Sequence, residues 1–296
     1  MQKFTFIGVT TGQSAATRLF PAWARELGLA DVRLVGCDLP IHAPPERYRE
    51  VVSRIKSDPN ERGALITTHK VDVFEACQDL FDSVDEYAQM CGETSCLAKR
   101  DGRLWAFATD TISSARALAE FYPASDAAEV LCLGAGGSAA AITVHLIQAR
   151  AASRITVVNR SARRLVAMRS IHGKLGSSIP VRYVENSDAG VNDRMIAELP
   201  PGSLVVNATG MGKDTPGSPI TKAAVFPDRG YAWELNYRGE LEFLRQAQRQ
   251  QAGRNLHVED GWRYFIHGWA VVMERVFEIQ IGDEGLARMA MRDPRL

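Results

Sequence analysis

The 296-residue sequence predicts an α/β protein with an N-terminal α/β domain, a second domain of the Rossmann type, and C-terminal helices that return to the first domain. Three observations predict this class. A chain of this length usually forms about two domains. Short apolar segments alternate with helical patterns, which is typical of mainly parallel sheets covered by helices. An apolar segment at 130–133 also runs directly into closely spaced glycines and an alanine-rich helix start.

The expected elements follow one another in a regular order. First-domain strands are expected at 4–9, 32–35, 63–68, 94–97 and 104–108, and helices at 15–27, 47–56, 69–80 and 110–121. Gly28 ends the first helix, and the polar turn Arg100–Gly102 joins the last two strands. In the second domain, strands are expected at 130–133, 154–158 and from Leu204 onward, then at 232–235, with helices at 240–250 and 261–281.

These elements give the domain limits. The first domain is placed at 1–122 and the Rossmann domain at 123–255. The segment 256–296 is expected to pack back on the first domain. The boundary is expected at Tyr122–Asp126, where a proline and small polar residues interrupt the helical pattern.

Composition narrows the class of partner. Lys and Arg number 35, as do Asp and Glu, so the zero net charge predicts no nucleic-acid partner and no anionic membrane surface. No apolar segment reaches membrane-spanning length, and no signal sequence precedes the first strand. The five scattered cysteines predict reduced thiols in a cytoplasmic protein. The six histidines show no metal-ligand spacing, so no metal is expected. We expect a small-molecule partner and a monomer or homodimer.

The glycine-rich turn predicts a dinucleotide site. Gly134 permits the tight turn, Gly136 lets the backbone approach a pyrophosphate, and Ala139 permits close packing of helix on strand. Free backbone N–H groups at the helix start then face the phosphates. The predicted cofactor contacts in this turn are Gly134, Ala135, Gly136, Gly137, Ser138 and Ala139. An ordinary strand–helix turn is the alternative, and the second strand at 154–158 favours the dinucleotide site.

The end of that second strand predicts NADP as the cofactor. An NAD site usually has Asp or Glu there to hold the ribose 2′-hydroxyl. This chain instead has Asn159, Arg160 and Ser161, followed by Arg163 and Arg164. Guanidinium groups bind phosphate oxygens through charge-assisted hydrogen bonds, whereas a carboxylate would repel the 2′-phosphate. A solvated basic helix start is the alternative interpretation.

Two charged residues in the first domain are candidates for proton transfer. Lys70 lies where a strand passes into a helix, and Asp110 lies directly after another strand. A lysine and an aspartate can together hydrogen-bond a hydroxyl group and move its proton during hydride transfer. A surface ion pair is the alternative interpretation.

In these pieces the chain resembles the shikimate/quinate dehydrogenase family. Residues 66–70 resemble its Thr-x-Pro-His-Lys block, and 107–110 resemble Gly-x-Asn-Thr-Asp. The glycine turn and Asn159–Ser161 are similar to its cofactor loop and its NADP-selecting Asn-Arg-Thr, and 207–212 is similar to the segment beside the nicotinamide. The resemblance implies an N-terminal α/β substrate-binding domain plus a Rossmann NADP-binding domain, with C-terminal helices returning to the first domain. It implies Lys70 and Asp110 as catalytic residues.

The resemblance also implies further contacts. Substrate contacts are expected from Ser14, Thr67, Ser95, Tyr237 and His267, and further cofactor contacts from Asn159, Arg160, Ser161, Arg164, Asn207, Ala208, Thr209 and Met211. His267 also fits a residue of the apolar core of its helix.

The substrate pocket departs from the family pattern. Ala16 replaces the second serine of Ser-x-Ser-Pro, and Ser95 replaces the asparagine of Gly-Ala-x-Asn-Thr within Gly92–Cys96. Thr68 replaces the proline of the lysine block, and Gly268 replaces a glutamine on the C-terminal helix.

The sequence therefore favours an NADP-dependent dehydrogenase that acts on a CH–OH group of shikimate or a related cyclic polyol. A paralogue that acts on a different cyclitol or on a quinate-like substrate is an alternative. A catalytically silent NADP-binding regulatory protein is another, although the presence of both Lys70 and Asp110 argues against it. A folate-dependent dehydrogenase of similar architecture is disfavoured by Asp110.

Overall fold

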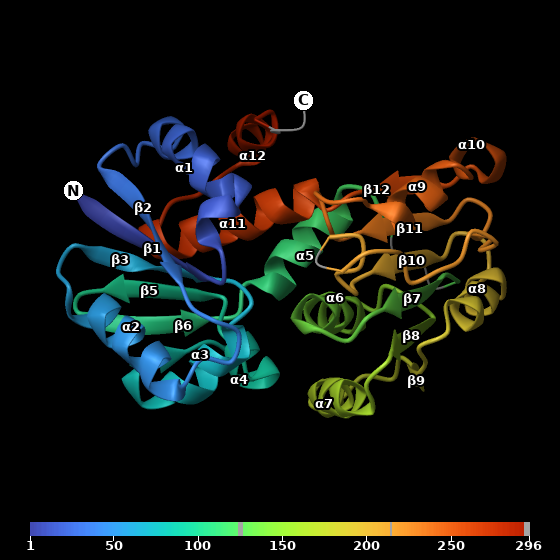
Figure 1. Ribbon diagram of the computed structural model, residues 1–296, viewed down its shortest axis with the longest axis horizontal. Coiled ribbons are helices and arrows are strands. Elements are labelled where there is room, and N and C mark those ends of the chain that lie inside the picture. Colours follow the sequence, from blue (N-terminus) through green and yellow to red (C-terminus); the bar gives the residue numbers. More distant parts are fainter. Residues whose placement is uncertain (124–126, 214, 293–296) are drawn as a thin grey trace. The chain divides into compact units, whose positions relative to one another are not determined.

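The computed structural model describes residues 1–123, 127–213 and 215–292, which form two compact units (Figure 1). Unit 1 comprises Met1–Asp110 and Ile266–Leu296, and unit 2 comprises Thr111–Phe265. Most of the expected boundary segment, Ala124–Asp126, lies outside the described residues. The assignment of substrate binding to the first domain and cofactor binding to the second remains a prediction.

Unit 1 is built on a six-stranded mixed sheet in the order β2-β1-β3-β5-β6-β4. Its strands are β1 (Gln2–Gly8), β2 (Val32–Asp38), β3 (Glu61–Ile66), β4 (Ser83–Val84), β5 (Cys96–Arg100) and β6 (Arg103–Phe107). The helices that precede the second unit are α1 (Ala15–Glu26), α2 (Pro45–Ser57), α3 (Lys70–Cys77) and α4 (Glu86–Cys91). Helix α5 (Asp110–Ala119) begins at the last residue of this part of unit 1 and continues into unit 2. Because β5 is antiparallel to both β3 and β6, the latter two run in the same direction and end at the same edge of the sheet.

Local sequence explains two boundaries in this unit. Gly28 has φ +74°, and Leu29 N–H donates to the Ala24 carbonyl at 2.7 Å, so a left-handed glycine ends α1 as expected. Asp101 and Gly102 have φ values of +49° and +74° between β5 and β6. Positive φ at both central residues is the geometry of a two-residue type I′ hairpin, for which Asp-Gly is strongly preferred.

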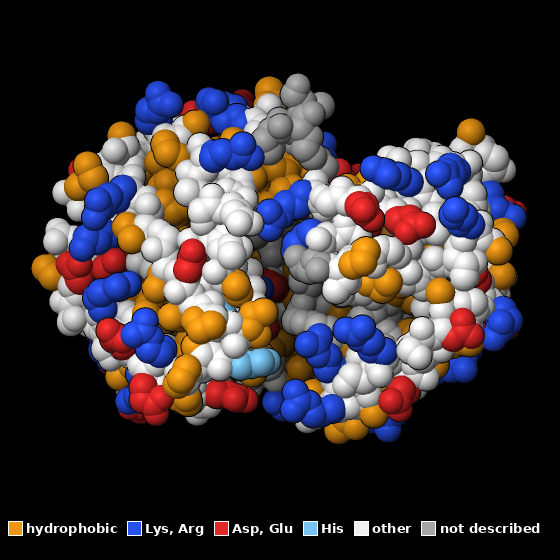
Figure 2. Space-filling view, in the orientation of Figure 1, with side chains coloured by type: hydrophobic (Ala, Val, Ile, Leu, Met, Phe, Trp, Pro, Cys, Tyr) orange, Lys and Arg blue, Asp and Glu red, His pale blue; other side chains and the backbone are white. Residues whose placement is uncertain are grey.

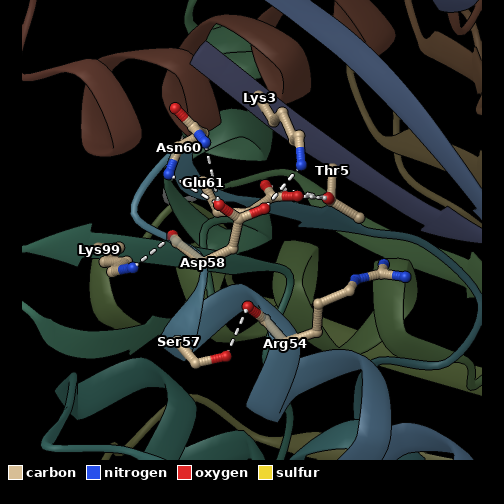
Figure 3. Close-up of polar contacts among 8 residues, drawn as sticks. All are labelled: Lys3, Thr5, Arg54, Ser57, Asp58, Asn60, Glu61 and Lys99. Carbon is tan, nitrogen blue, oxygen red and sulfur yellow. Dashed lines mark hydrogen bonds and ion pairs between the residues drawn. The ribbon is translucent and has the colours of Figure 1, made fainter.

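A polar network ties the amino ends of β1 and β3 to the segment after α2 (Figure 3). Lys3 Nζ donates to Asp58 Oδ2 at 2.6 Å, and Lys99 Nζ donates to the Asp58 carbonyl at 2.6 Å. Nearby, Thr5 Oγ1 lies 3.0 Å from Glu61 Oε1, and the Glu61 side chain is buried. This network lies at the opposite end of β3 from Lys70.

The C-terminal helices α11 (Trp262–Phe277) and α12 (Asp283–Ala290) complete the core of unit 1. The Trp269 ring lies 6.1 Å from that of Phe4 and 5.2 Å from that of Phe6. Trp23 Nε1 donates to the Met289 carbonyl at 3.2 Å. The expected return of the C-terminal helices to the first domain is confirmed, but it starts at Ile266: residues 256–265, which were expected to return as well, belong to unit 2.

Unit 2 contains a fully parallel six-stranded sheet in the order β12-β11-β10-β7-β8-β9. Its strands are β7 (Glu129–Leu133), β8 (Arg154–Asn159), β9 (Val181–Glu185), β10 (Leu204–Asn207), β11 (Tyr231–Glu234) and β12 (His257–Glu259). Its helices are α6 (Gly137–Gln148), α7 (Ala162–Gly173), α8 (Ala189–Ala197), α9 (Glu242–Gln248) and α10 (Gln251–Arg254). The order reverses direction at β7, the strand that leads into the glycine turn. The predicted α/β class with a Rossmann domain is confirmed.

Candidate active site

The centre of the candidate site in unit 1 is an ion pair between Lys70 and Asp110. Lys70 begins α3 and Asp110 begins α5, so each follows the carboxyl end of a strand at the same sheet edge. Lys70 Nζ donates to the Asp110 carboxylate, and the two side chains are only 19% and 13% exposed. The pair is therefore largely removed from water, which sets it apart from an ordinary surface ion pair.

The pKa of Lys70 is raised above its ordinary value. Burial acts to lower it, and the nearby carboxyl groups of Asp110 and Glu93 outweigh that effect. At neutral pH Lys70 is therefore an ammonium ion. Such a group can donate a hydrogen bond to an alcohol or carbonyl oxygen while Asp110 orients it.

The turn before Lys70 has a backbone conformation that the proline of the Thr-x-Pro-His-Lys block could not adopt. Thr68 is exposed and has φ +60°, a left-handed conformation that proline cannot adopt because its ring holds φ near −65°. On either side of it, Thr67 N–H donates to the Ile7 carbonyl at 3.0 Å, and His69 N–H donates to the Thr67 carbonyl at 2.5 Å. The turn that aims Lys70 is thus built differently from the Thr-x-Pro-His-Lys pattern, and Thr67 lies at its start.

The His69 side chain fixes this turn through contacts with Tyr48 and Leu39. It is fully buried, with Nδ1 3.2 Å from Tyr48 Oη and Nε2 3.1 Å from the Leu39 carbonyl. Because a carbonyl only accepts, Nε2 carries a proton in this arrangement, and Tyr48 Oη also donates to Asp72 Oδ2 at 3.2 Å. His69 therefore has a positioning role.

Ser95 supports the segment that carries Asp110. Its Oγ lies 2.9 Å from Thr109 Oγ1 and accepts the Thr109 N–H at 2.7 Å. Ser95 is 2% exposed, so its hydroxyl serves a buried internal network. Substrate contact by Ser95 remains a prediction.

The other expected substrate residues of unit 1 lie on its helices. Ser14 is the N-cap of α1, and its Oγ accepts the Ala16 N–H at 3.3 Å, which leaves its own O–H free to donate. Ala16, at the position of the family's second serine, has no hydroxyl, and the hydroxyl of the next residue, Thr17, donates to the Thr11 carbonyl at 2.8 Å. His267 is buried on α11, next to the Gly268 that replaces the family glutamine.

Unit 2 holds the glycine turn in the geometry that a phosphate-binding loop requires. Gly134 has φ +114°, and a Cβ placed on it would lie 2.5 Å from the Ala208 carbonyl oxygen, so only glycine fits. Gly136 is the N-cap of α6, and a Cβ placed there would lie 3.7 Å from Arg164 Nη1. Ala139 is fully buried against the sheet, as the packing role of that position requires. The open backbone and the start of α6 therefore suit a pyrophosphate.

The basic residues after β8 lie beside this turn. Arg160, Arg163 and Arg164 are exposed, and Figure 2 shows Lys and Arg side chains gathered over α7 on the visible face of unit 2. Asn159 Nδ2 donates to the Ser161 carbonyl at 3.2 Å, which fixes the start of this basic segment. The residues expected to select a 2′-phosphate are thus presented together, with Arg164 reaching the glycine turn.

The loop after β10 is organised by a carboxyl group that sequence reasoning missed. Asn207 Nδ2 donates to Glu234 Oε2 at 2.6 Å, and Asn207 Oδ1 accepts from Thr209 Oγ1 at 2.6 Å. Asn236 Nδ2 bridges Glu234 Oε1 at 2.7 Å and the Met211 carbonyl at 3.1 Å. Asn207 is therefore a buried anchor of the loop, while Ala208, Thr209 and Met211 lie at or near its surface.

Glu234 is fully buried, and burial raises its pKa to about 7, although its hydrogen bonds from Asn236 and Asn207 act to lower it. The signal for it was a carboxyl group inside the apolar segment 231–235. Such a group is rarely buried without a network of partners.

Tyr237 follows β11 and packs with the rings at the start of α11. Its ring lies 4.5 Å from that of Phe265 and 5.5 Å from that of Trp262. Its role as a substrate contact remains a prediction.

Within residues 1–123, 127–213 and 215–292, no group of three or more His, Cys, Asp or Glu could hold a metal ion. Among the helices in these ranges, none combines the length and apolar character needed to cross a membrane.

Comparison with known proteins bears on both units. No family model matches the chain. A shikimate dehydrogenase (NADP(+)) of Afipia carboxidovorans is 29% identical over 291 residues, which cover 97% of this chain and 93% of that protein. Shikimate 5-dehydrogenase of Thermus thermophilus, solved in complex with NADP(H) and shikimate, has a TM-score of 0.75 at 26% identity and covers 99% of both chains.

Quinate dehydrogenase of Corynebacterium glutamicum, solved in complex with NAD, has a TM-score of 0.79 at 21% identity over 100% of this chain and 99% of that one, and shows the same fold. These similarities confirm the resemblance to the shikimate/quinate dehydrogenases.

Proposed function

We propose that this protein is an NADP-dependent dehydrogenase that acts on a CH–OH group. It would catalyse reversible hydride transfer between NADP(H) and a ring carbonyl or hydroxyl of shikimate, 3-dehydroshikimate or a related cyclic polyol. The observation that carries the proposal is the buried Lys70–Asp110 ion pair, which stands at the positions of the family's catalytic residues. The relatives and the structural neighbours support the same reaction class.

The residues of unit 2 fit the cofactor. The turn at Gly134–Ala139 leaves no room for a side chain at Gly134 and presents the start of α6, so it would hold the pyrophosphate. Arg160 and Arg164 would hold the 2′-phosphate, and the loop Asn207–Met211 would lie beside the nicotinamide. The bound cofactor would supply or take up the hydride.

The residues of unit 1 would control the proton. The Lys70 ammonium would donate a hydrogen bond to the substrate oxygen and stabilise negative charge that develops there. Asp110 would orient that ammonium and, when an alcohol is oxidised, accept a proton through the pair. Ser14 would still donate one hydrogen bond to a substrate carboxylate.

Which ring compound is bound depends on the polar groups at the substrate site, and Ala16 provides no hydroxyl where the family has its second serine. A hydrogen bond to a charged group contributes roughly 1.5–3 kcal/mol, so the loss at Ala16 would weaken carboxylate binding about ten- to a hundredfold or more. We therefore expect a high KM for shikimate. Quinate and cyclitols without a carboxylate are the alternative substrates. A silent regulatory role is the other alternative, and it would not use the buried ion pair.

The cellular setting belongs to the same proposal. All five cysteines carry free thiols, and Cys77, Cys96 and Cys132 are buried, which suits a reducing compartment. We place the protein in the cytoplasm, as a monomer or homodimer.

The test is a direct assay of reduced-cofactor absorbance. The wild type and Ala16→Ser are given NADP with shikimate, quinate or a cyclitol that lacks the carboxylate, and kcat/KM is compared. We expect turnover of at least one ring alcohol, and a lower KM for shikimate in Ala16→Ser. Micromolar KM for shikimate in the wild type, unchanged by Ala16→Ser, would show that the pocket is that of an ordinary shikimate dehydrogenase. Absence of turnover with every compound would overturn the proposal.

A further inference from the structure

A third ionisable side chain, Glu93, is buried beside the Lys70–Asp110 pair. Glu93 is 5% exposed and directly follows Gly92, the left-handed C-cap of α4 with φ +65°. The next residue, Thr94, donates its N–H to the Lys70 carbonyl at 3.1 Å. The backbone that carries Glu93 is therefore held beside the first turn of α3 by the Thr94–Lys70 hydrogen bond.

Glu93 stands where the family motif Gly-Ala-x-Asn-Thr has alanine. A buried carboxyl group is costly unless it is partnered or protonated, so its placement in an otherwise apolar position calls for a specific role. Here the buried carboxyl group lies at the site that we propose moves protons.

The charged groups that act on Glu93 come from two elements packed against it, Lys70 from α3 and Asp110 from α5. At the other end of α4, its N-cap Asp85 accepts hydrogen bonds from the N–H groups of Ala88 and Ala108 at 2.8 and 3.1 Å. Burial raises the pKa of Glu93 to about 7, Lys70 acts to lower it, and Asp110 acts to raise it. Near neutral pH this carboxyl group therefore gains or loses a proton at little cost.

We propose that Glu93 is the proton store of the Lys70–Asp110 pair. This inference rests on the proposed function. When a ring alcohol is oxidised, its C–H and O–H bonds break and a C=O double bond forms. The hydride passes to NADP⁺, which is reduced. The hydroxyl proton enters the pair, and the pair returns to its ammonium–carboxylate form by passing one proton to the Glu93 carboxylate. In carbonyl reduction the protonated Glu93 supplies that proton. Because Glu93 acts through Lys70, it is a positioning residue and has no required contact with substrate.

The chain offers a matched control in Glu61. It is a buried glutamate of the same unit at the amino end of β3, its pKa is also raised by burial, and its carboxyl group is bound by Thr5 (Figure 3). It lies at the opposite end of the strand that leads to Lys70.

The experiment measures kcat against pH in both directions for the wild type, Glu93→Gln, Glu93→Asp and Glu61→Gln, with thermal melting to confirm folding. For the wild type we expect kcat of alcohol oxidation to rise with pH around pH 7, and kcat of carbonyl reduction to fall. Glu93→Gln should lose both pH-dependent limbs and about tenfold in kcat at pH 7. Glu93→Asp should restore a limb, and Glu61→Gln should retain the wild-type profile.

Glu93→Ala supplies a second variant, since alanine stands in the family motif at this position and should fold. It should behave as Glu93→Gln does. Turnover by the wild type with the same pH profile in Glu93→Gln and Glu93→Ala would overturn this inference alone. Absence of turnover by the wild type would overturn the proposed function, and this inference with it.

Discussion

At the scale of single residues, the proposed reaction would depend on two side chains that begin different helices, Lys70 and Asp110. We expect Lys70→Ala and Asp110→Asn each to lower kcat by about 10²–10⁴-fold, because each removes one half of the proton-transfer pair. Steady-state kinetics and a cofactor-binding titration provide the measurements. Affinity for NADP should remain, since the glycine turn and the basic segment belong to unit 2.

The double variant of these two residues separates a working pair from two independent contributions. It should be little slower than the worse single variant, because the two groups act as a unit. Near-normal turnover in Lys70→Ala would leave the ion pair with a structural role only.

Cofactor choice is a second property of single residues. Arg160 is exposed after β8, and that strand ends in Asn159 in place of the acidic residue of an NAD site. Loss of a guanidinium paired with a phosphate costs roughly 1.5–3 kcal/mol, so Arg160→Ala should weaken NADP binding about ten- to a hundredfold and leave NAD binding nearly unchanged. Dissociation constants for both cofactors test this, and an equal loss for both would refute the 2′-phosphate assignment.

At the scale of elements, the passage from β7 to α6 depends on one glycine. In Gly134→Ala the new Cβ would meet the Ala208 carbonyl oxygen at 2.5 Å in a backbone with φ +114°, so the turn must move. We expect a loss of roughly 1–3 kcal/mol in unfolding free energy and a marked loss of NADP affinity.

Gly253→Ala is the control for that variant. Gly253 lies in α10 of the same unit, and a Cβ there would meet nothing within 4 Å. Its stability should change little or rise slightly. Denaturant unfolding and cofactor titration of both variants provide the comparison, and equal behaviour would show that the turn tolerates a side chain.

The elements also show where sequence reasoning succeeds and fails. Asp101–Gly102 and Gly28 were assigned correctly, because each carries a local backbone requirement that few residues meet. The strands β4, β9 and β12 were missed. They lie at sheet edges and are short or half-exposed, so no apolar periodicity marks them.

In the candidate site, too, some residues can be predicted from the sequence and others cannot. The glycine turn could be read from the residues themselves. Lys70 and Asp110 are 40 residues apart, and their positions after two strands made them candidates, which the family resemblance then supported. Their contact could not be derived from the sequence, because it depends on the antiparallel β5 between β3 and β6. Glu93 and Glu234 were missed because burial, which gives them their character, is a tertiary property.

At the scale of the whole molecule, buried carboxyl groups should make stability depend on pH. Glu234 has an ordinary pKa of 4.5 in the unfolded chain and about 7 in the folded protein. Between these values the folded state holds a proton that the unfolded state has lost, so the free energy of unfolding falls as pH rises. The decrease from Glu234 is roughly 3 kcal/mol and is complete above about pH 7. Glu93 contributes in the same direction.

Urea unfolding at pH 5 and pH 8 measures this effect. Glu234 should raise the unfolding free energy of the wild type at pH 5 relative to pH 8. In Glu234→Gln this contribution is absent, so the difference between its unfolding free energies at pH 5 and pH 8 should depart from that of the wild type by that amount. An unchanged difference in Glu234→Gln would mean that this carboxyl group is ionised in the folded protein at both pH values.

The division of the first unit between the two ends of the chain has a consequence for synthesis. Residues 1–110 leave the ribosome early, while the helix that carries Trp269 follows only after the whole of the other unit. At 5–20 residues per second that interval lasts on the order of 10–30 s. During it, Trp269 is not yet present to cover the apolar surface at Phe4 and Phe6. The contiguous unit is complete in the nascent chain first and should fold first, and translation products that stop before Ile266 should require chaperones and aggregate without them.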